Sequence, residues 1–340
     1  MKIVVDAFGG DNAPKEIVEG AVLALEKHPD LQLILCGDEK IITKLLNGRG
    51  EGRVQILHAP DVITNDDTPT LAIRSKTNSS LVKAFDVLKE NDDVIALVSA
   101  GSTGAILTGA IMKIGRIKGI SRPALAPILP TKLSNKDVLL IDCGANVDCK
   151  PINLQHFALM GSAYYSILYG VDAPRVGLLS NGTEDHKGNE LTKEAFPLIK
   201  ASSVNFIGNV EAREYMSGIV DVMVSEGFAG NVLLKGSEGA VAAVLSLLKH
   251  SIKSHLSSKI GALFMRKTFK ELKNRMDVLG KHGGSPFLGC KKLVMKNHGS
   301  SSRINISSSI DQAILLHENK LIEKIETLLA KTNGVENAGN

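Results

Sequence analysis

The 340-residue chain has no tryptophan, few other aromatic residues and four cysteines. No apolar run approaches the roughly 18 residues that a transmembrane helix needs, and Asp6 interrupts the apolar N-terminus too early for a secretory signal peptide. The cysteines lack the short paired spacing of a zinc site or a disulfide framework, which indicates reduced thiols in a cytosol. With 44% hydrophobic and 22% charged residues, the chain is typical of a soluble globular protein.

Basic residues are unevenly distributed along the chain. Between Lys249 and Lys296, twelve Lys or Arg residues stand against two acidic ones, a local balance of +10. The net charge is only +4, so the rest of the chain carries −6. A basic segment on an otherwise acidic protein fits a negatively charged partner, although a solvated helical face is the commoner reason for such a run. We expect no nucleic acid among its partners.

Apolar runs alternate with helical patterns along most of the chain. Strands are predicted at 1–6, 32–36, 54–58, 94–99, 138–142, 175–180, 205–208 and 220–225, with helices at 16–27, 69–89 and 105–112 among those between them. Strands bounded by Gly, Asp and Asn turns and separated by helices indicate βα units, and so an α/β fold with a mostly parallel sheet. We expect residues 1–330 to form one large domain and residues 331–340 to be a frayed tail.

Five of the predicted strands end in turns rich in glycine, small hydroxyl residues, asparagine and carboxylates. These turns are 6–11 (DAFGGD), 99–104 (SAGSTG), 142–146 (DCGAN), 180–189 (SNGTEDHKGN) and 225–231 (SEGFAGN). Ligands of such folds bind at the carboxyl ends of the strands, and these residue types let backbone N–H groups approach an anion. The pattern predicts one shared anion or phosphate site. Neither a P-loop motif nor a dinucleotide fingerprint appears at these turns.

Taken together, the turns resemble the motifs of the PlsX family of bacterial phosphate acyltransferases. The resemblance is carried by VDAFGGDNAP, SAGSTGA, LIDCGAN, NGTEDHKGNELTKEAF, the block from Gly208 to Gly239, and KNHGSSS. It implies transfer of an acyl group from acyl carrier protein to inorganic phosphate in phospholipid synthesis, and we expect no cofactor. It also implies a three-layer α/β/α fold like that of isopropylmalate dehydrogenase, a homodimer, and work in the cytoplasm at the inner face of the cell membrane.

The chemistry of this reaction fits the residue types of the turns. Phosphate is itself the nucleophile, so the protein has to hold a dianion and stabilise the oxyanion that forms. Backbone N–H groups and hydroxyls suit phosphate binding, which we predict for Gly101, Ser102, Thr103 and Gly104. A lysine suits either task as a point charge, and we predict catalytic roles for Lys187, His186, Asn181 and Asn231. A thiol has a pKa of about 8.5, so a strong acid for the leaving group is optional.

The remaining polar residues of the turns are predicted to bind or orient the substrate, without a metal. Turn formation and helix N-capping are equally good explanations for the Asp and Asn residues. The candidates are Asp6, Gly9, Gly10, Asp11, Asp142, Asn146, Asn189, Glu226 and His298.

Two other functions remain open. A short-chain phosphate acyltransferase that uses coenzyme A, or a decarboxylating dehydrogenase, would use the same fold. A non-catalytic protein that docks carrier protein or lipid through its basic segment belongs to another class. Formation of acyl phosphate from an acylated carrier protein separates the three.

The basic segment contains two apolar stripes of helical spacing, about 150° apart if the helix were continuous. They are Val241, Leu245, Leu248, Ile252 and Leu256, and then Met265, Phe269, Leu272 and Met276. One straight helix cannot bury both, so we predict a hairpin of two helices over about 237–278, broken within 257–263. Its tip would hold Ile260, Leu263 and Phe264, ringed by Lys259, Arg266 and Lys267. Such a tip suits an anionic membrane surface or an acidic carrier protein, and a dimer interface is the alternative.

Overall fold

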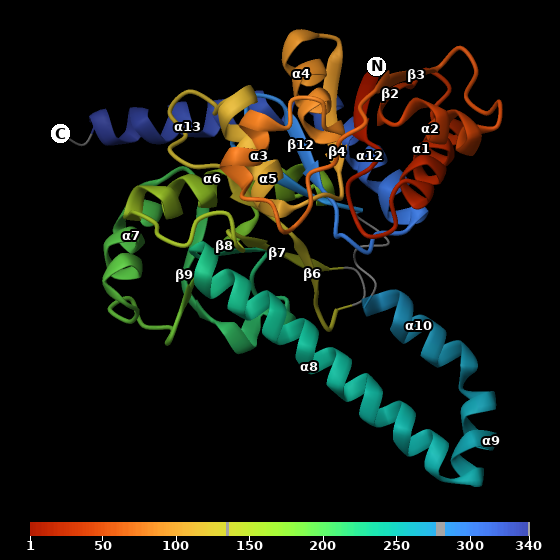
Figure 1. Cartoon of the computed structure of the whole chain (residues 1–340). Coiled ribbons are helices and arrows are strands. Elements are labelled where there is room, and N and C mark those ends of the chain that lie inside the picture. Colours follow the sequence, from red (N-terminus) through yellow and green to blue (C-terminus); the bar gives the residue numbers. More distant parts are fainter. Residues whose placement is uncertain (134–135, 277–282, 339–340) are drawn as a thin grey trace.

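The computed structural model describes residues 1–133, 136–276 and 283–338, and its strands form two sheets flanked by helices (Figure 1). The first sheet has the strand order β3–β2–β1–β4–β12–β11–β5. Its strands are β1 (Lys2–Asp6), β2 (Gln32–Gly37), β3 (Val54–His58), β4 (Val94–Ser99), β5 (Ala124–Leu125), β11 (Ser285–Leu288) and β12 (Leu293–Lys296). The strands from β3 to β12 pair in parallel, whereas β11 is antiparallel to both of its neighbours.

The second sheet has the order β6–β7–β10–β8–β9. Its strands are β6 (Ile128–Pro130), β7 (Asp137–Ile141), β8 (Arg175–Ser180), β9 (Asn205–Glu211) and β10 (Val222–Val224). Only the edge strand β6 pairs antiparallel. Both sheets are therefore mostly parallel, as predicted.

Helices cover both faces of each sheet, because successive residues of the central strands point to opposite faces and both sets are apolar. In β1, Ile3 and Val5 join one apolar cluster and Val4 joins another. The helices of the body are α1 (Lys15–Lys27), α2 (Glu39–Leu46), α3 (Pro69–Ser75), α4 (Ser80–Glu90), α5 (Thr103–Gly109), α6 (Pro151–Tyr169), α7 (Glu190–Ala201), α12 (Arg303–Glu318) and α13 (Leu321–Ala338), with a π turn (Ala110–Ile114) and a 3-10 helix (Ala212–Ser217). The result is the predicted three-layer α/β/α architecture.

The two sheets share their largest apolar cluster. It contains Ile3 and Val98 of the first sheet, Leu139 and Val222 of the second, and the fully buried Phe157 of α6. The strands were expected in one sheet, and the structure corrects this. A βα alternation predicts parallel strands but carries no information on which strands pair.

Two further expectations are corrected at helix ends. The helix predicted over 69–89 is two helices, because the chain leaves the helix at Lys76 and Ser79 starts α4 by accepting a hydrogen bond from Val82 N. The tail predicted to fray from residue 331 is helical to Ala338. Its buried Thr332 Oγ1 accepts a hydrogen bond from Ser203 N at 3.2 Å, which holds α13 on the body.

The predicted helical hairpin is present and projects from the body (Figure 1). It consists of α8 (Gly227–Ser254), α9 (Leu256–Phe264) and α10 (Arg266–Met276). It begins ten residues earlier than predicted, and 257–263 is helical rather than broken. The direction of the chain changes instead at His255 and Met265, which have non-helical backbone angles. Of the predicted hairpin residues, 277 and 278 lie outside the described ranges.

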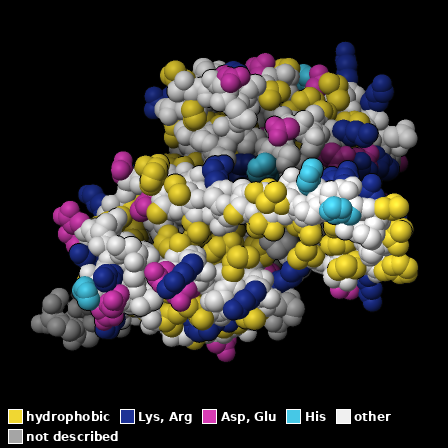
Figure 2. Space-filling model, turned by 90° about the horizontal axis from the view of Figure 1, so that it is seen from below, with side chains coloured by type: hydrophobic (Ala, Val, Ile, Leu, Met, Phe, Trp, Pro, Cys, Tyr) yellow, Lys and Arg dark blue, Asp and Glu magenta, His cyan; other side chains and the backbone are white. Residues whose placement is uncertain are grey.

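The tip of the hairpin exposes apolar side chains beside cations. Leu256, Leu263 and Phe264 are 74%, 57% and 86% exposed, and Lys259, Arg266 and Lys267 are also exposed. Figure 2 shows apolar and basic side chains gathered at this end of the molecule. Within the described ranges, α8 is also the one helix long and apolar enough to cross a membrane by length and composition. Polar residues interrupt it, so it contains no long unbroken apolar run.

Candidate active site

Three adjacent strand ends of the first sheet meet at the candidate site. Strands β1, β4 and β12 are parallel neighbours, so the turns that follow them lie at one edge of the sheet. Asp11 N donates to Gly299 O at 2.8 Å, and Asn297 N donates to Ser99 O at 2.8 Å. The turns of residues 6–11, 99–104 and 296–299 are therefore tied to one another by their backbones.

A buried carboxylate holds the predicted phosphate turn from behind. Asp6 Oδ2 accepts a hydrogen bond from Ser99 Oγ at 2.7 Å, and Ser99 Oγ accepts one from Gly101 N at 3.0 Å. Burial raises the pKa of Asp6. A Cβ on Gly9 would lie 2.4 Å from Asp6 Oδ2 and 2.8 Å from Gly101 N, so only glycine lets the two turns approach. Asp6 and Gly9 thus position the turn from outside the cavity.

The N–H of Gly101 already donates to Ser99 Oγ. The hydrogen-bond donors of the turn that can bind a ligand are therefore those of the residues after Gly101. Ser102 precedes α5, and its carbonyl accepts from Ile106 N at 2.9 Å. The N–H groups of Thr103 and Gly104 belong to the first helical turn, which leaves such groups without intrahelical acceptors. The predicted phosphate site is therefore narrowed from 101–104 to the donors of Ser102, Thr103 and Gly104.

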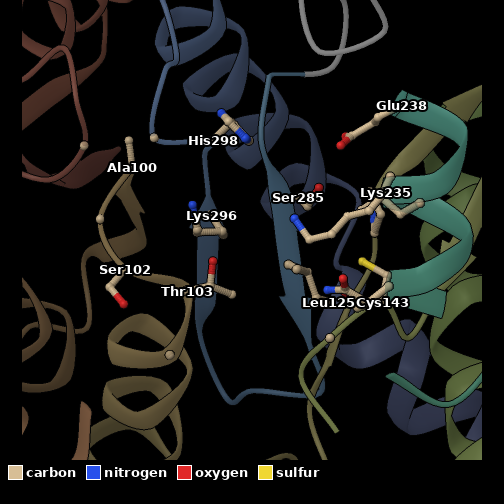
Figure 3. Close-up of a pocket in the computed structure, with 18 of the residues that line it drawn as sticks. Ala100, Ser102, Thr103, Leu125, Cys143, Lys235, Glu238, Ser285, Lys296 and His298 are labelled. Carbon is tan, nitrogen blue, oxygen red and sulfur yellow. The ribbon is translucent and has the colours of Figure 1, made fainter. Parts of the chain in front are cut away.

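These donors face a cavity of about 1060 Å³, which we call the first cavity (Figure 3). Its wall contains the predicted residues Gly10, Asp11, Gly101, Ser102, Thr103, Gly104, Asn231 and His298. The opposite wall is the first half of α8, with Lys235 and Glu238. Apolar residues complete it, among them Leu129, Leu234, Val241 and Leu245. The cavity is thus polar at the strand ends, and its α8 wall carries both charged and apolar side chains.

His298 reaches this cavity from the turn after β12. Its Nδ1 accepts a hydrogen bond from Ser300 N at 3.2 Å and lies 2.8 Å from Ser300 Oγ. Because Nδ1 accepts from a backbone N–H, the neutral ring carries its proton on Nε2. Nε2 can therefore donate to a ligand.

Asp142 organises the turn after β7 rather than facing the cavity. Its fully buried carboxylate accepts from Leu125 N, Cys143 N, Ala145 N and Asn146 N, and from Asn146 Nδ2, over 2.7–3.2 Å. Burial raises its pKa and these hydrogen bonds oppose the shift. Asn146 also donates from Nδ2 to Pro123 O at 2.7 Å. For both residues, turn formation is the role that the contacts show.

The same turn anchors the hairpin. Gly227 N donates to Asn146 O at 2.7 Å, and Asn231 Nδ2 donates to Cys143 O at 3.2 Å. Cys143 lines the first cavity, but burial raises the pKa of its thiol well above the ordinary value. The reactive form of a cysteine is the thiolate, so Cys143 is not a nucleophile near neutral pH.

Three predicted residues lie on the other side of α8, in a second cavity of about 890 Å³. Asn181 Oδ1 accepts from Gly188 N at 3.0 Å, and Asn189 caps α7 by accepting from Thr192 N at 2.9 Å. Glu226 caps α8 by accepting from Ala229 N at 2.9 Å. All three are engaged in turn closure or N-capping. The structure thus divides the five strand-end turns between two cavities: turns 6–11, 99–104 and 142–146 reach the first, 180–189 reaches the second, and 225–231 contributes to both.

His186 and Lys187 line neither of these cavities. His186 is exposed, and Lys187 is half-buried with its stem over Gly182. The carbonyl of Glu184 accepts from Lys187 N at 2.9 Å and from Asn209 Nδ2 at 2.8 Å, which fixes the turn. In this chain, the two predicted catalytic side chains therefore do not meet the predicted phosphate turn.

Two lysines that lie in the resembling motifs but were not predicted as site residues line the first cavity. Lys235 stands on α8 and Lys296 is the last residue of β12 (Figure 3). The run 293–296 (LVMK) is the only sequence signal for β12, and four residues are too few for a periodicity argument. Among the residues that the structure describes, no group of three or more His, Cys, Asp or Glu side chains could hold a metal ion.

Comparison with solved structures defines the class of fold. A phosphotransacetylase from Streptococcus pyogenes matches 96% of this chain and 94% of its own length, with a TM-score of 0.58 and 18% identity. A branched-chain phosphotransacylase from Enterococcus faecalis matches 92% and 98%, with a TM-score of 0.55 and 16% identity. The fold is therefore that of phosphotransacylases.

The sequence comparisons give the family. The model of a family described as "Fatty acid synthesis protein" matches residues 1–324. The phosphate acyltransferase of Clostridium acetobutylicum is 45% identical over 335 residues, which are 98% of this chain and 100% of that protein. The phosphate acyltransferase of Thermoanaerobacterium thermosaccharolyticum is 44% identical over 326 residues, 96% of each. The chain belongs to this family, the PlsX family that its strand-end motifs resemble.

Proposed function

We propose that this protein transfers a fatty acyl group from acyl carrier protein to inorganic phosphate, and that the resulting acyl phosphate enters phospholipid synthesis. The observation that carries the proposal is the first cavity, which joins the donors of Ser102, Thr103 and Gly104 to apolar side chains that include Leu234, Val241 and Leu245 of α8. An acyl phosphate has the same two parts, an anionic head and an alkyl chain. The names of the relatives support the phosphate acyltransferase step.

The polar end of the cavity supplies what the reaction needs. Phosphate held by fixed N–H groups and hydroxyls keeps one oxygen free to attack the thioester carbonyl. His298 Nε2–H and the Lys235 ammonium are donors for the oxyanion that forms. The reaction uses no nucleophile of the protein, in agreement with the raised pKa of the Cys143 thiol.

The apolar end suits a long acyl chain better than an acetyl group. Leu129, Leu234, Val241 and Leu245 continue the cavity away from the strand ends and along α8. At about 0.8 kcal/mol per buried methylene, each part of a long chain laid on this wall adds affinity that a short chain lacks. This wall is the reason to place long-chain donors before the short-chain alternative.

The proposal is tested by incubating the protein with phosphate and either palmitoyl acyl carrier protein or palmitoyl coenzyme A. Trapping with hydroxylamine and mass spectrometry then measures acyl phosphate. We expect the product from the carrier-protein donor. Product from coenzyme A alone would favour the coenzyme A alternative, and no product from either donor would favour a docking protein.

The exposed side chains of the hairpin support two further parts of the proposal, the location of the protein at a membrane and its assembly into a homodimer. Exposed Leu263 and Phe264 beside Lys259, Arg266 and Lys267 suit the surface of an anionic membrane. The same cations suit an acidic carrier protein that brings its acyl chain. Further along the hairpin, Val244 and Leu247 of α8 are 62% and 68% exposed, which favours a homodimer that covers the arms. The protein then works in the cytoplasm at the inner face of the cell membrane.

The double variant Leu263→Glu with Phe264→Glu tests whether the tip of the hairpin contacts the membrane while its arms form the dimer. We expect it to lose sedimentation with phosphatidylglycerol vesicles while it keeps the dimer and its activity on soluble substrates. Ile41→Glu, on the exposed face of α2, is the control and should still bind vesicles. A double variant that becomes monomeric and still binds vesicles would make the tip an interface and refute the membrane assignment.

A further inference from the structure

Lys296 is a cationic residue of the first cavity to which the proposed reaction has so far given no task. It ends β12 opposite Ser99 of β4, so that its Cα lies beside the strand end that leads into the phosphate turn. Neighbours in a parallel pair point to the same face of the sheet. The side chain of Lys296 therefore shares a face with Ser99, which holds Gly101.

Among the described residues, no carboxylate pairs with the amine of Lys296. Its Nζ donates to the carbonyl of Asn297, and no ion pair of the described residues includes it. Lys292, which precedes β12, pairs with Asp92, and Lys113 pairs with Asp86 at 2.5 Å, whereas Lys235 of the same cavity, like Lys296, forms no ion pair among the described residues. A partly buried ammonium in a cavity wall that forms no ion pair within the described ranges can bind an anionic ligand.

We propose that the Lys296 ammonium holds phosphate against the donors of Ser102, Thr103 and Gly104, and then protonates the sulfur that leaves the acyl group. This assignment rests on the proposed function and names the acid for its leaving-group step. In Figure 3, Lys296 lies on β12 next to Thr103, and Lys235 approaches from α8 on the other side of the cavity that all three line.

The step balances without any further reactant. An oxygen of the hydrogen phosphate dianion forms the new C–O bond, the C–S bond breaks, and its electron pair stays on sulfur. Lys296 gives a proton to this sulfur, and the proton of hydrogen phosphate returns to Lys296. The products are an acyl phosphate dianion and a neutral thiol.

Burial makes Lys296 suited to this exchange. It lowers the pKa of the amine to about 8, against the opposing charge of Asp11, and an ordinary thiol has a pKa of about 8.5. Proton transfer between the two is then nearly balanced in free energy. Among the described residues, the other titratable groups that line this cavity are Asp11, Cys143, Tyr215, Lys235, Glu238 and His298.

The test compares three variants with the wild type, using palmitoyl acyl carrier protein and phosphate. Lys296→Met should lower kcat about 100-fold, the usual size of an acid–base contribution. Lys296→Arg keeps the charge but not the transferable proton, so it should keep the KM for phosphate and still have a low kcat. Lys291→Met removes an exposed lysine from the same β11–β12 hairpin and should behave as wild type.

The pH profile gives a readout that a structural role would not move. Lys296 is protonated below its pKa, so the wild-type kcat should fall as the pH rises through about 8, and Lys296→Arg should lack this limb. A wild-type kcat that stays level from about pH 7 to 10 refutes proton donation, as does full kcat in Lys296→Arg. An active wild type with an equally active Lys296→Met refutes the whole assignment, whereas an inactive wild type refutes the proposed function.

Discussion

Asp142 offers a quantitative test of how the strand-end turns are held. Its buried carboxylate satisfies five donors, four from the backbone and one from Asn146 Nδ2. A buried donor without an acceptor costs about 1–3 kcal/mol. Asp142→Ala removes the acceptor of all five donors, so at the lower limit it destabilises the fold by about 5 kcal/mol. Water that enters the small cavity offsets part of it. We expect the free energy of unfolding to fall by about 3–5 kcal/mol.

Urea unfolding at one protein concentration measures this loss. Asp142→Asn keeps one acceptor oxygen and turns an amide toward the remaining donors, so an intermediate loss of about 2 kcal/mol is expected. Asp148→Asn, an exposed position of the same loop, should change stability by less than about 0.5 kcal/mol. If Asp142→Ala costs less than about 1 kcal/mol, the carboxylate does not hold the turn and the reasoning is wrong.

Two further variants test the phosphate turn and the anchor of the hairpin. Thr103→Val should raise the KM for phosphate about tenfold, because a hydrogen bond to a charged group is worth roughly 1.5–3 kcal/mol. An unchanged KM in steady-state kinetics would refute the assignment of Thr103 to phosphate binding. Gly230→Ala should destabilise the protein by about 1–3 kcal/mol, because its Cβ would lie 1.9 Å from Asp142 O. Thermal unfolding measures both this variant and its control, Gly239→Ala, on the open arm of the same helix. A Cβ at Gly239 would have no neighbour within 4 Å, so the control should be neutral or slightly stabilising.

The sequence predicted those parts of the fold that repeat a pattern over many residues. Apolar runs such as 94–99 located the central strands, and the two stripes after Val241 predicted a projecting hairpin. Pairing between strands was not predictable, because it depends on contacts that are distant in sequence. For this reason the turns at 180–189 and 99–104 were expected to meet, although they belong to different sheets.

The candidate site was predictable at the level of turns but not of individual residues. Asn189 and Glu226 have side chains that suit catalysis and N-capping equally, and only the hydrogen bonds to Thr192 N and Ala229 N distinguish these roles. Lys296 opens the motif KNHGSSS, but the motif does not predict its place in the cavity, which follows from the pairing of a four-residue strand with β4. Position in the sheet, which the sequence does not report, decides which polar residues face a ligand.

A crystal structure of the protein soaked with inorganic phosphate tests the central claim most directly. The account predicts phosphate in the first cavity, with oxygens within hydrogen-bond distance of the N–H groups of Thr103 and Gly104 and of Lys296 Nζ. Phosphate bound instead at the turn of residues 181–189, beside Lys187, with the first cavity empty, would contradict it.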